Sequence, residues 1–146
     1  MYALRTGAFV EIYWRDVVVG DILKIEEDEP LCADVVLFSS SSPEGISFIQ
    51  TASLDGETNL KIRQGLAQTE HLKEAQMFDG FSASMECEAP NNRLYTFDGT
   101  LHVRSLPQKD PDLPPLGGMR VAHASTFRAV TSSRLSFRAQ NLRWAK

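Results

Sequence analysis

The chain has 146 residues, of which 42% are hydrophobic and 23% are charged, with a formal net charge of −4 at pH 7. This size is typical of one domain, and the composition is that of ordinary globular proteins, which excludes wholesale disorder. The charge is uneven, because residues 1–112 hold 9 basic and 19 acidic residues while residues 113–146 hold six basic and no acidic ones. An acidic body argues against a nucleic-acid partner, which basic residues would have to bind.

The sequence predicts neither a membrane span nor an export signal. The longest apolar runs, residues 17–19 and 35–38, are far shorter than the roughly 20 residues needed to cross a bilayer. The first residues lack the charged start and apolar middle of a secretory signal. Cys32 and Cys87 lack metal-ligand spacing and lie in or beside apolar runs, which favours reduced thiols over a disulfide. The chain by itself is therefore expected to be soluble and cytosolic.

The first fifty residues are typical of strands, because short β-branched runs alternate with turn residues. Strands are predicted at residues 9–13, 21–25, 34–38 and 46–50. The acidic run at residues 26–30 is interpreted as a solvated loop, since it lacks the glycine and the fixed offsets of a calcium loop.

Residues 51–63, Thr-Ala-Ser-Leu-Asp-Gly-Glu-Thr-Asn-Leu-Lys-Ile-Arg, carry the candidate chemistry. Asp55 followed by Gly56 favours a tight turn with positive φ, so Glu57 should stand on a short exposed loop. A carboxylate there can reach a substrate held by another surface, and a glycine lets the backbone approach a phosphate closely. The quartet from Asp55 to Thr58 is a weak signal by itself, because such quartets also occur in ordinary hairpin turns.

Beyond this loop, Thr69 is predicted to cap a short helix over residues 69–78, and strands are predicted at 84–87 and 94–103. The fold class is therefore mainly β, a β-rich α+β chain with one short helix, arranged as a sandwich or jelly roll. Residues 106–118 contain four prolines and two glycines and are interpreted as a linker. We expect a folded domain over residues 8–117 and a basic, poorly ordered tail over 118–146.

The extended loop resembles the actuator loop of the phospholipid-flippase branch of P-type ATPases, whose segment ends in Asp-Gly-Glu-Thr-Asn-Leu-Lys. Cation-pumping relatives have Thr-Gly-Glu instead, so Asp55 favours the flippase branch. Two further blocks are similar to the same family in order and spacing. They are residues 14–22 with 33–37 before the loop, and residues 86–99 after it.

The resemblance implies a distorted jelly-roll actuator domain in which Glu57 positions and deprotonates the water that hydrolyses an aspartyl phosphate. Gly56 would allow close approach, and Asp55 and Thr58 would shape the loop. Lys61 and Arg63 would either contact a partner domain or, as the favoured reading, be solvated surface charges.

The implied partners all belong to a parent pump: its phosphorylation and nucleotide-binding domains, its membrane helices and, only through these, phospholipid. Mg²⁺ and ATP would serve the parent pump, with no cofactor or metal bound by this chain. The domain would lie at the cytoplasmic face of a membrane. Because the sequence contains no Asp-Lys-Thr-Gly motif, the chain alone is not expected to hydrolyse ATP.

The sequence departs from this family at Cys32, where Pro is usual, at Ser53, where Asn is usual, and throughout residues 119–146. The last departure suggests an altered reading frame, an unspliced segment or a mispredicted gene. Two other hypotheses stay open. The chain could be an interaction module whose Arg-rich tail binds acidic surfaces, or an unrelated β-rich domain in which Glu57 is only a turn residue.

Overall fold

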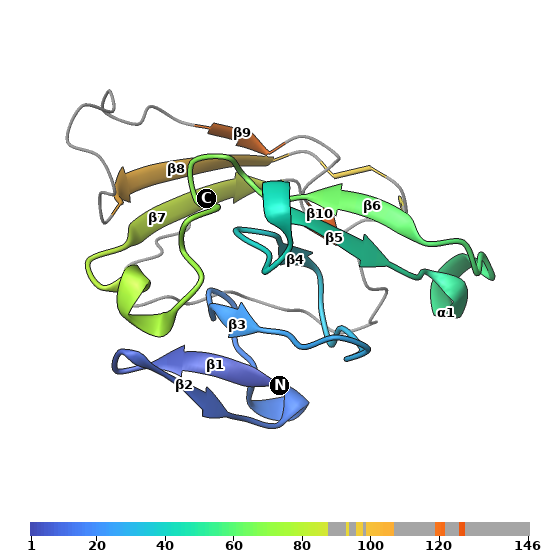
Figure 1. The fold of residues 1–146 in the computed structure, drawn as a ribbon, viewed down its shortest axis with the longest axis horizontal. Coiled ribbons are helices and arrows are strands. Elements are labelled where there is room, and N and C mark those ends of the chain that lie inside the picture. Colours follow the sequence, from blue (N-terminus) through green and yellow to red (C-terminus); the bar gives the residue numbers. More distant parts are fainter. Residues whose placement is uncertain (88–92, 94–95, 98, 107–118, 122–125, 128–146) are drawn as a thin grey trace.

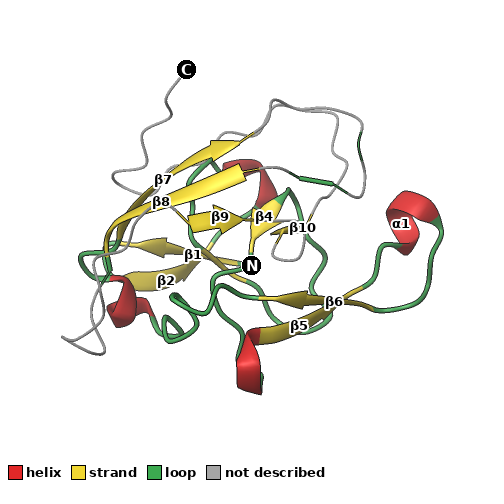
Figure 2. Cartoon of the chain, turned by 90° about the horizontal axis from the view of Figure 1, so that it is seen from above, coloured by secondary structure: helices red, strands yellow, loops and turns green. Residues whose placement is uncertain are grey.

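The computed structural model describes residues 1–87, 93, 96–97, 99–106, 119–121 and 126–127. Short strands dominate this part of the chain, together with one α-helix of a single turn (Figures 1 and 2). The strands are β1 (Tyr2–Arg5), β2 (Ala8–Glu11), β3 (Leu23–Lys24), β4 (Val35–Val36), β5 (Ile46–Ile49), β6 (Lys61–Gln64), β7 (Ser82–Cys87), β8 (Gly99–Ser105), β9 (Met119–Val121) and β10 (Thr126–Phe127). The helices are α1 (Ala52–Asp55) and three short 3-10 helices, η1 (Trp14–Asp16), η2 (Pro43–Gly45) and η3 (Ala75–Phe78).

All strand pairs in the described residues are antiparallel, and they form four small sheets with the orders β2-β1-β3, β10-β4, β5-β6 and β7-β8-β9. The mainly β fold with one short α-helix is therefore confirmed. Each predicted strand before residue 51 overlaps an observed one, although β3 and β4 are only two residues long. The strand predicted at 94–103 begins only at Gly99, and residues 94, 95 and 98 lie outside the described part.

The predicted helix over residues 69–78 is wrong in extent, because only Ala75–Phe78 are helical and in the 3-10 form. Thr69 is fully buried and caps no helix. Its hydroxyl instead donates to the carbonyl of Phe38 at 2.8 Å, with the carbonyl of Leu66 at 3.2 Å. A long-range hydrogen bond thus replaces the local one that the sequence pattern predicts, and it ties this segment to Phe38, two residues after β4.

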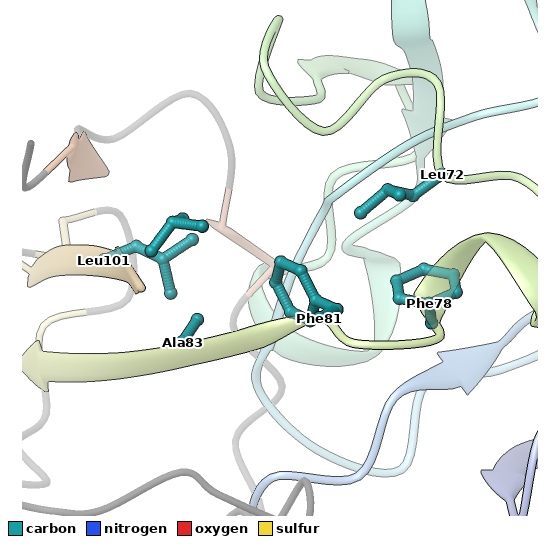
Figure 3. Close-up of a cluster of buried hydrophobic side chains, with 6 residues drawn as sticks. Leu72, Phe78, Phe81, Ala83 and Leu101 are labelled. Carbon is teal, nitrogen blue, oxygen red and sulfur yellow. The ribbon is translucent and has the colours of Figure 1, made fainter. Parts of the chain in front are cut away.

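The core lies between β7, β8 and the segment that precedes β7 (Figure 3). Phe78 and Phe81 meet edge to face with ring centroids 5.9 Å apart, and Phe38 packs on Phe81 at 5.5 Å. Leu72 and Leu101 are almost completely buried. The full cluster comprises Leu72, Phe78, Phe81, Ala83, Leu101 and Val103.

The packed part of the structure begins before residue 8, although the sequence predicts that the domain starts at residue 8. β1 is the central strand of its sheet, and Ala3 within it is completely buried. At the other end, β9 pairs with β8 and β10 pairs with β4. The rest of the predicted tail lies outside the described residues, so its separation from the domain stays a prediction.

Candidate functional site

The candidate loop is the connection between β5 and β6. The two strands pair from Ile46 with Gln64 to Ile49 with Lys61, so the hairpin closes at the base of the loop. Beyond this base the chain forms α1 and returns, and in both views α1 projects from the end of the hairpin, away from the other sheets (Figures 1 and 2). The hairpin therefore holds the loop out as the tip of a protruding arm.

The single turn of α1 ends at Gly56, which has φ 77° and ψ −1°. Its N–H donates to the carbonyl of Ala52 at 3.1 Å, as is usual where a helix ends in the left-handed conformation. The predicted positive φ is therefore confirmed. A Cβ at this position would have no neighbour within 4 Å, so the backbone conformation and not a lack of space favours glycine.

The carboxylate of Asp55 organises the inside of the loop. Its side chain is only 6% exposed, and it accepts a hydrogen bond at 2.9 Å from the backbone N–H of Glu57. The hydroxyl of Thr51 lies 2.9 and 3.0 Å from the two carboxylate oxygens. Asp55 thus joins the start of α1 to the residue that follows the turn.

Lys61 is the third member of this group. Its Nζ lies 2.8 Å from Oγ1 of Thr51, 2.8 Å from Oδ2 of Asp55 and 2.9 Å from Oε2 of Glu57. The Lys61 side chain is 22% exposed and that of Glu57 is 56% exposed. The candidate catalytic carboxylate therefore faces solvent while one of its oxygens is held from the protein side.

These contacts change the proton affinities of Asp55 and Lys61, which are both partly buried. The hydrogen bonds from the ammonium group of Lys61 and then from the backbone N–H of Glu57 hold the pKa of Asp55 far below its usual range. Conversely, hydrogen bonds to Asp55 and then to Glu57 raise the pKa of Lys61. Both groups are therefore charged at neutral pH.

Asp55, Gly56 and Glu57 lie together at the end of α1, and Thr58 contributes to the loop through its backbone. The carbonyl of Thr58 accepts a hydrogen bond at 3.4 Å from Nε2 of Gln50, which links the two sides of the loop. Thr51 and Lys61 were missed as parts of the site. The acidic pair Asp55 and Glu57 followed by one lysine was the available signal, since two nearby carboxylates call for a cation.

An apolar surface adjoins the loop on the β5–β6 hairpin. Phe48 and Ile62 are cross-strand partners, and they are 59% and 60% exposed. Leu60, just before β6, is 64% exposed. We call these three residues the hairpin patch.

Within the described residues, no group of three or more His, Cys, Asp or Glu side chains is placed to hold a metal ion. In the same residues, no helix is both long enough and apolar enough to span a bilayer. The thiols of Cys32 and Cys87 are free, and burial raises the pKa of both.

No family model matches the chain. Curated relatives do match it: a phospholipid-transporting ATPase of Schizosaccharomyces pombe is 51% identical over 113 residues, which are 77% of this chain and 9% of that protein. The phospholipid-transporting ATPase FetA of Mus musculus is 46% identical over 67% of the chain and 8% of its own length. Phospholipid-transporting ATPase DRS2 of Saccharomyces cerevisiae is 44% identical over 68% of the chain and 8% of its own length.

The chain thus spans less than a tenth of the length of these relatives. A stretch of 113 residues in a chain of 146 must include residues 34–113, so the loop with Glu57 lies inside the similar part. Identity of 44–51% over such a stretch reflects common ancestry. Over most of its length, this chain is therefore homologous to one segment of the phospholipid-transporting ATPases, a flippase group of P-type ATPases.

Proposed function

We propose that this segment is the actuator domain of a phospholipid-transporting P-type ATPase and that Glu57 activates the water that hydrolyses the aspartyl phosphate of the pump. The observation that carries the proposal is the position of Glu57. Its side chain is 56% exposed in the loop that follows α1, within a segment homologous to phospholipid-transporting ATPases.

The chemistry requires a base and a water molecule held in line with the phosphorus. The oxygen of the water forms a new bond to phosphorus, the bond from phosphorus to the aspartyl oxygen breaks, and the aspartate leaves as a carboxylate. The carboxylate of Glu57 accepts the proton that the water loses. A general base must lie within hydrogen-bond reach of this water, and a carboxylate on a protruding loop can be brought there by domain movement.

Gly56 supports this role because it leaves the turn before Glu57 open. Nothing lies within 4 Å of the place where a Cβ would stand, so a phosphorylated surface can approach the backbone closely. Asp55 supports it by fixing the N–H of Glu57 at 2.9 Å. The carbonyl of Thr58 is tied to Gln50 across the loop.

The hairpin patch supports docking of this arm against another surface. Phe48, Leu60 and Ile62 are each more than half exposed and lie beside the loop. Exposed apolar residues that gather in one place often mark an interaction site. We propose that in the parent pump this side of the hairpin faces the phosphorylation domain when Glu57 reaches the phosphate.

The relatives are named as phospholipid-transporting ATPases. We accordingly propose that the parent pump uses Mg²⁺ and ATP through its own phosphorylation and nucleotide-binding domains. The actuator would lie at the cytoplasmic face of the membrane and couple hydrolysis to lipid movement through the membrane helices joined to it. Phospholipid would be bound by those helices and not by this segment.

The test uses the full-length Schizosaccharomyces pombe relative in which residues 8–117 of this chain replace the corresponding segment. Glu57→Gln removes the proton-accepting charge while it keeps the size of the side chain. The matched control is Glu27→Gln, an exposed glutamate in a loop far along the chain from the hairpin. We expect Glu57→Gln to accumulate phosphoenzyme and to stop lipid transport, while the control behaves as the parent. Normal transport by Glu57→Gln would refute the proposal.

A further inference from the structure

We propose that Lys61 is a positioning residue for Glu57: its ammonium group ties the carboxylates of Asp55 and Glu57 to the start of β6 and presents Glu57 in one orientation. This inference rests on the function proposed above for Glu57. It assigns Lys61 a structural role inside the loop, whereas the sequence favours a solvated surface charge.

The anchor of the arrangement is the sheet. Lys61 is the first residue of β6 and pairs with Ile49, the last residue of β5. Glu57 lies four residues earlier, outside any helix or strand. A functional group supported from a strand is held more accurately than one that depends on a loop alone. The contact with Lys61 therefore fixes the carboxylate of Glu57 relative to the β5–β6 sheet.

The ammonium group of Lys61 can bind several oxygen atoms of the loop at once. An ammonium group has three N–H donors and no acceptor. Oxygen atoms of Thr51, Asp55 and Glu57 lie 2.8, 2.8 and 2.9 Å from Nζ. Two of these oxygens are carboxylate oxygens, and hydrogen bonds between charged groups are about twice as strong as those between neutral ones. Lys61 thus binds the beginning of α1, its end and the residue after the turn with one group.

The charges of the loop also require a cation at this place. Asp55 and Glu57 are two residues apart, and the side chain of Asp55 is only 6% exposed, so water screens its charge poorly. Two neighbouring carboxylates repel each other unless a cation lies between them. Loss of the Lys61 charge would remove the attraction and leave the repulsion, and Glu57 would turn away from Asp55.

The contact is compatible with the role of a base. Lys61 binds Oε2 of Glu57, and a carboxylate has about four lone-pair sites on its two oxygens. Oε1 can therefore accept a hydrogen bond from water while Oε2 is held. The exposure of the Glu57 side chain, 56%, gives water access to it.

The main experiment measures the decay of phosphoenzyme after an ATP chase in the same chimeric pump. Lys61→Gln should slow decay by about 10- to 100-fold, because a misplacement of about 1 Å can cost about 100-fold. Lys61→Arg keeps the charge and should restore most of the rate. The control is Lys73→Gln, which removes an exposed lysine outside the hairpin and should leave the rate unchanged.

A double variant separates positioning from general damage. If Lys61 acts through Glu57, Lys61→Gln should slow decay no further once Glu57→Gln is present, because residues that act as a unit are non-additive. A further slowing of similar size would overturn the inference. A normal phosphoenzyme decay rate for Lys61→Gln, together with slow decay for Glu57→Gln, would also overturn the inference. That result would leave the proposed function intact. A normal rate for Glu57→Gln would refute the proposed function, and the inference with it.

A second measurement covers the case in which the Lys61→Gln pump is not phosphorylated. Carboxyl ¹³C signals of the 146-residue chain report the pKa of Asp55 and the environment of Glu57. In Lys61→Gln, the pKa of Asp55 should rise and the Glu57 signal should move, while Lys73→Gln should change neither. Unchanged signals in Lys61→Gln would show that Lys61 does not hold the loop and would overturn the inference.

Discussion

The backbone N–H of Glu57 donates a hydrogen bond to Oδ1 of Asp55 over 2.9 Å. This bond spans the left-handed residue Gly56 and makes the side chain of Asp55 part of the turn. A side chain that accepts from the N–H two residues ahead replaces a backbone hydrogen bond and favours the turn conformation. The orientation of the Glu57 backbone therefore depends on the residue at position 55.

Substitutions of Asp55 test this dependence by amide hydrogen exchange of the isolated chain. Asp55→Ala removes the acceptor, and exchange at the Glu57 amide should become about 2- to 10-fold faster, the net effect of one hydrogen bond. Asp55→Asn keeps an oxygen acceptor, so exchange at the Glu57 amide should change less than in Asp55→Ala. Equal exchange at this amide in Asp55→Ala and the parent chain would contradict the account.

Gly56→Ala tests the need for a left-handed residue. The added Cβ meets no atom within 4 Å, so only the backbone conformation opposes it. The free energy of unfolding should fall by about 1–2 kcal/mol, the usual cost of this conformation for a residue with a Cβ. Gly56→Asn should lower the free energy of unfolding less than Gly56→Ala, because asparagine tolerates the left-handed region better than alanine. Urea unfolding measures both, and an unchanged midpoint for Gly56→Ala would show that the turn relaxes.

The Asp55–Lys61 pair predicts a pH dependence of stability. The folded-state pKa of Asp55 lies below its unfolded value of about 3.9, so its contribution is complete above this value and is lost as the pH falls towards the folded pKa. The raised pKa of Lys61 gives a contribution that is complete below about 10.4 and is lost as the pH rises through the folded value.

Unfolding of the parent chain and of Lys61→Gln should be compared between pH 2 and pH 7. The parent should be more stable at neutral pH, and the difference between the two should shrink below about pH 4, where Asp55 begins to lose its charge in the unfolded chain. If the difference in free energy of unfolding between the parent chain and Lys61→Gln stays constant over this pH range, the Asp55–Lys61 ion pair does not contribute to stability.

The core cluster predicts which leucine matters for folding. Leu72 is 1% exposed, and Leu72→Ala should lower the free energy of unfolding by about 2–5 kcal/mol because it leaves a cavity. Leu60 is 64% exposed, so Leu60→Ala makes the same chemical change at the surface and should cost about 0.5 kcal/mol or less. Similar losses at both positions in urea unfolding would contradict the assignment of the core.

The sequence was informative where local chemistry decides the structure. Asp55 and Gly56 predict the turn and its positive φ, and alternating β-branched runs predict the strands that precede it, including β5. The helix predicted from Thr69 is wrong in extent because the Thr69 hydroxyl donates to the carbonyl of Phe38, 31 residues away, and does not cap a helix. The sequence does not predict β6, because residues 51–63, which include most of it, have the pattern of a loop.

The role of Lys61 also depends on a long-range relation. Its ammonium group reaches Thr51 and Asp55 only because the hairpin register pairs Lys61 with Ile49. Nothing in the spacing of these residues along the chain fixes that register. The parts of the site made by consecutive residues are therefore predictable, whereas the acidic pair signals a nearby cation without fixing where that cation lies.

The central claim concerns the step in which water attacks the phosphoenzyme, and one rate isolates that step. In the chimeric pump, phosphoenzyme formed from ATP is chased with unlabelled ATP, and its decay is followed for the parent, Glu57→Gln and the Glu27→Gln control. Loss of a general base slows a reaction by about 10²- to 10⁴-fold, so Glu57→Gln should be phosphorylated normally and decay more slowly by that factor. Decay at the rate of the parent, or failure to become phosphorylated at all, would contradict the role of Glu57.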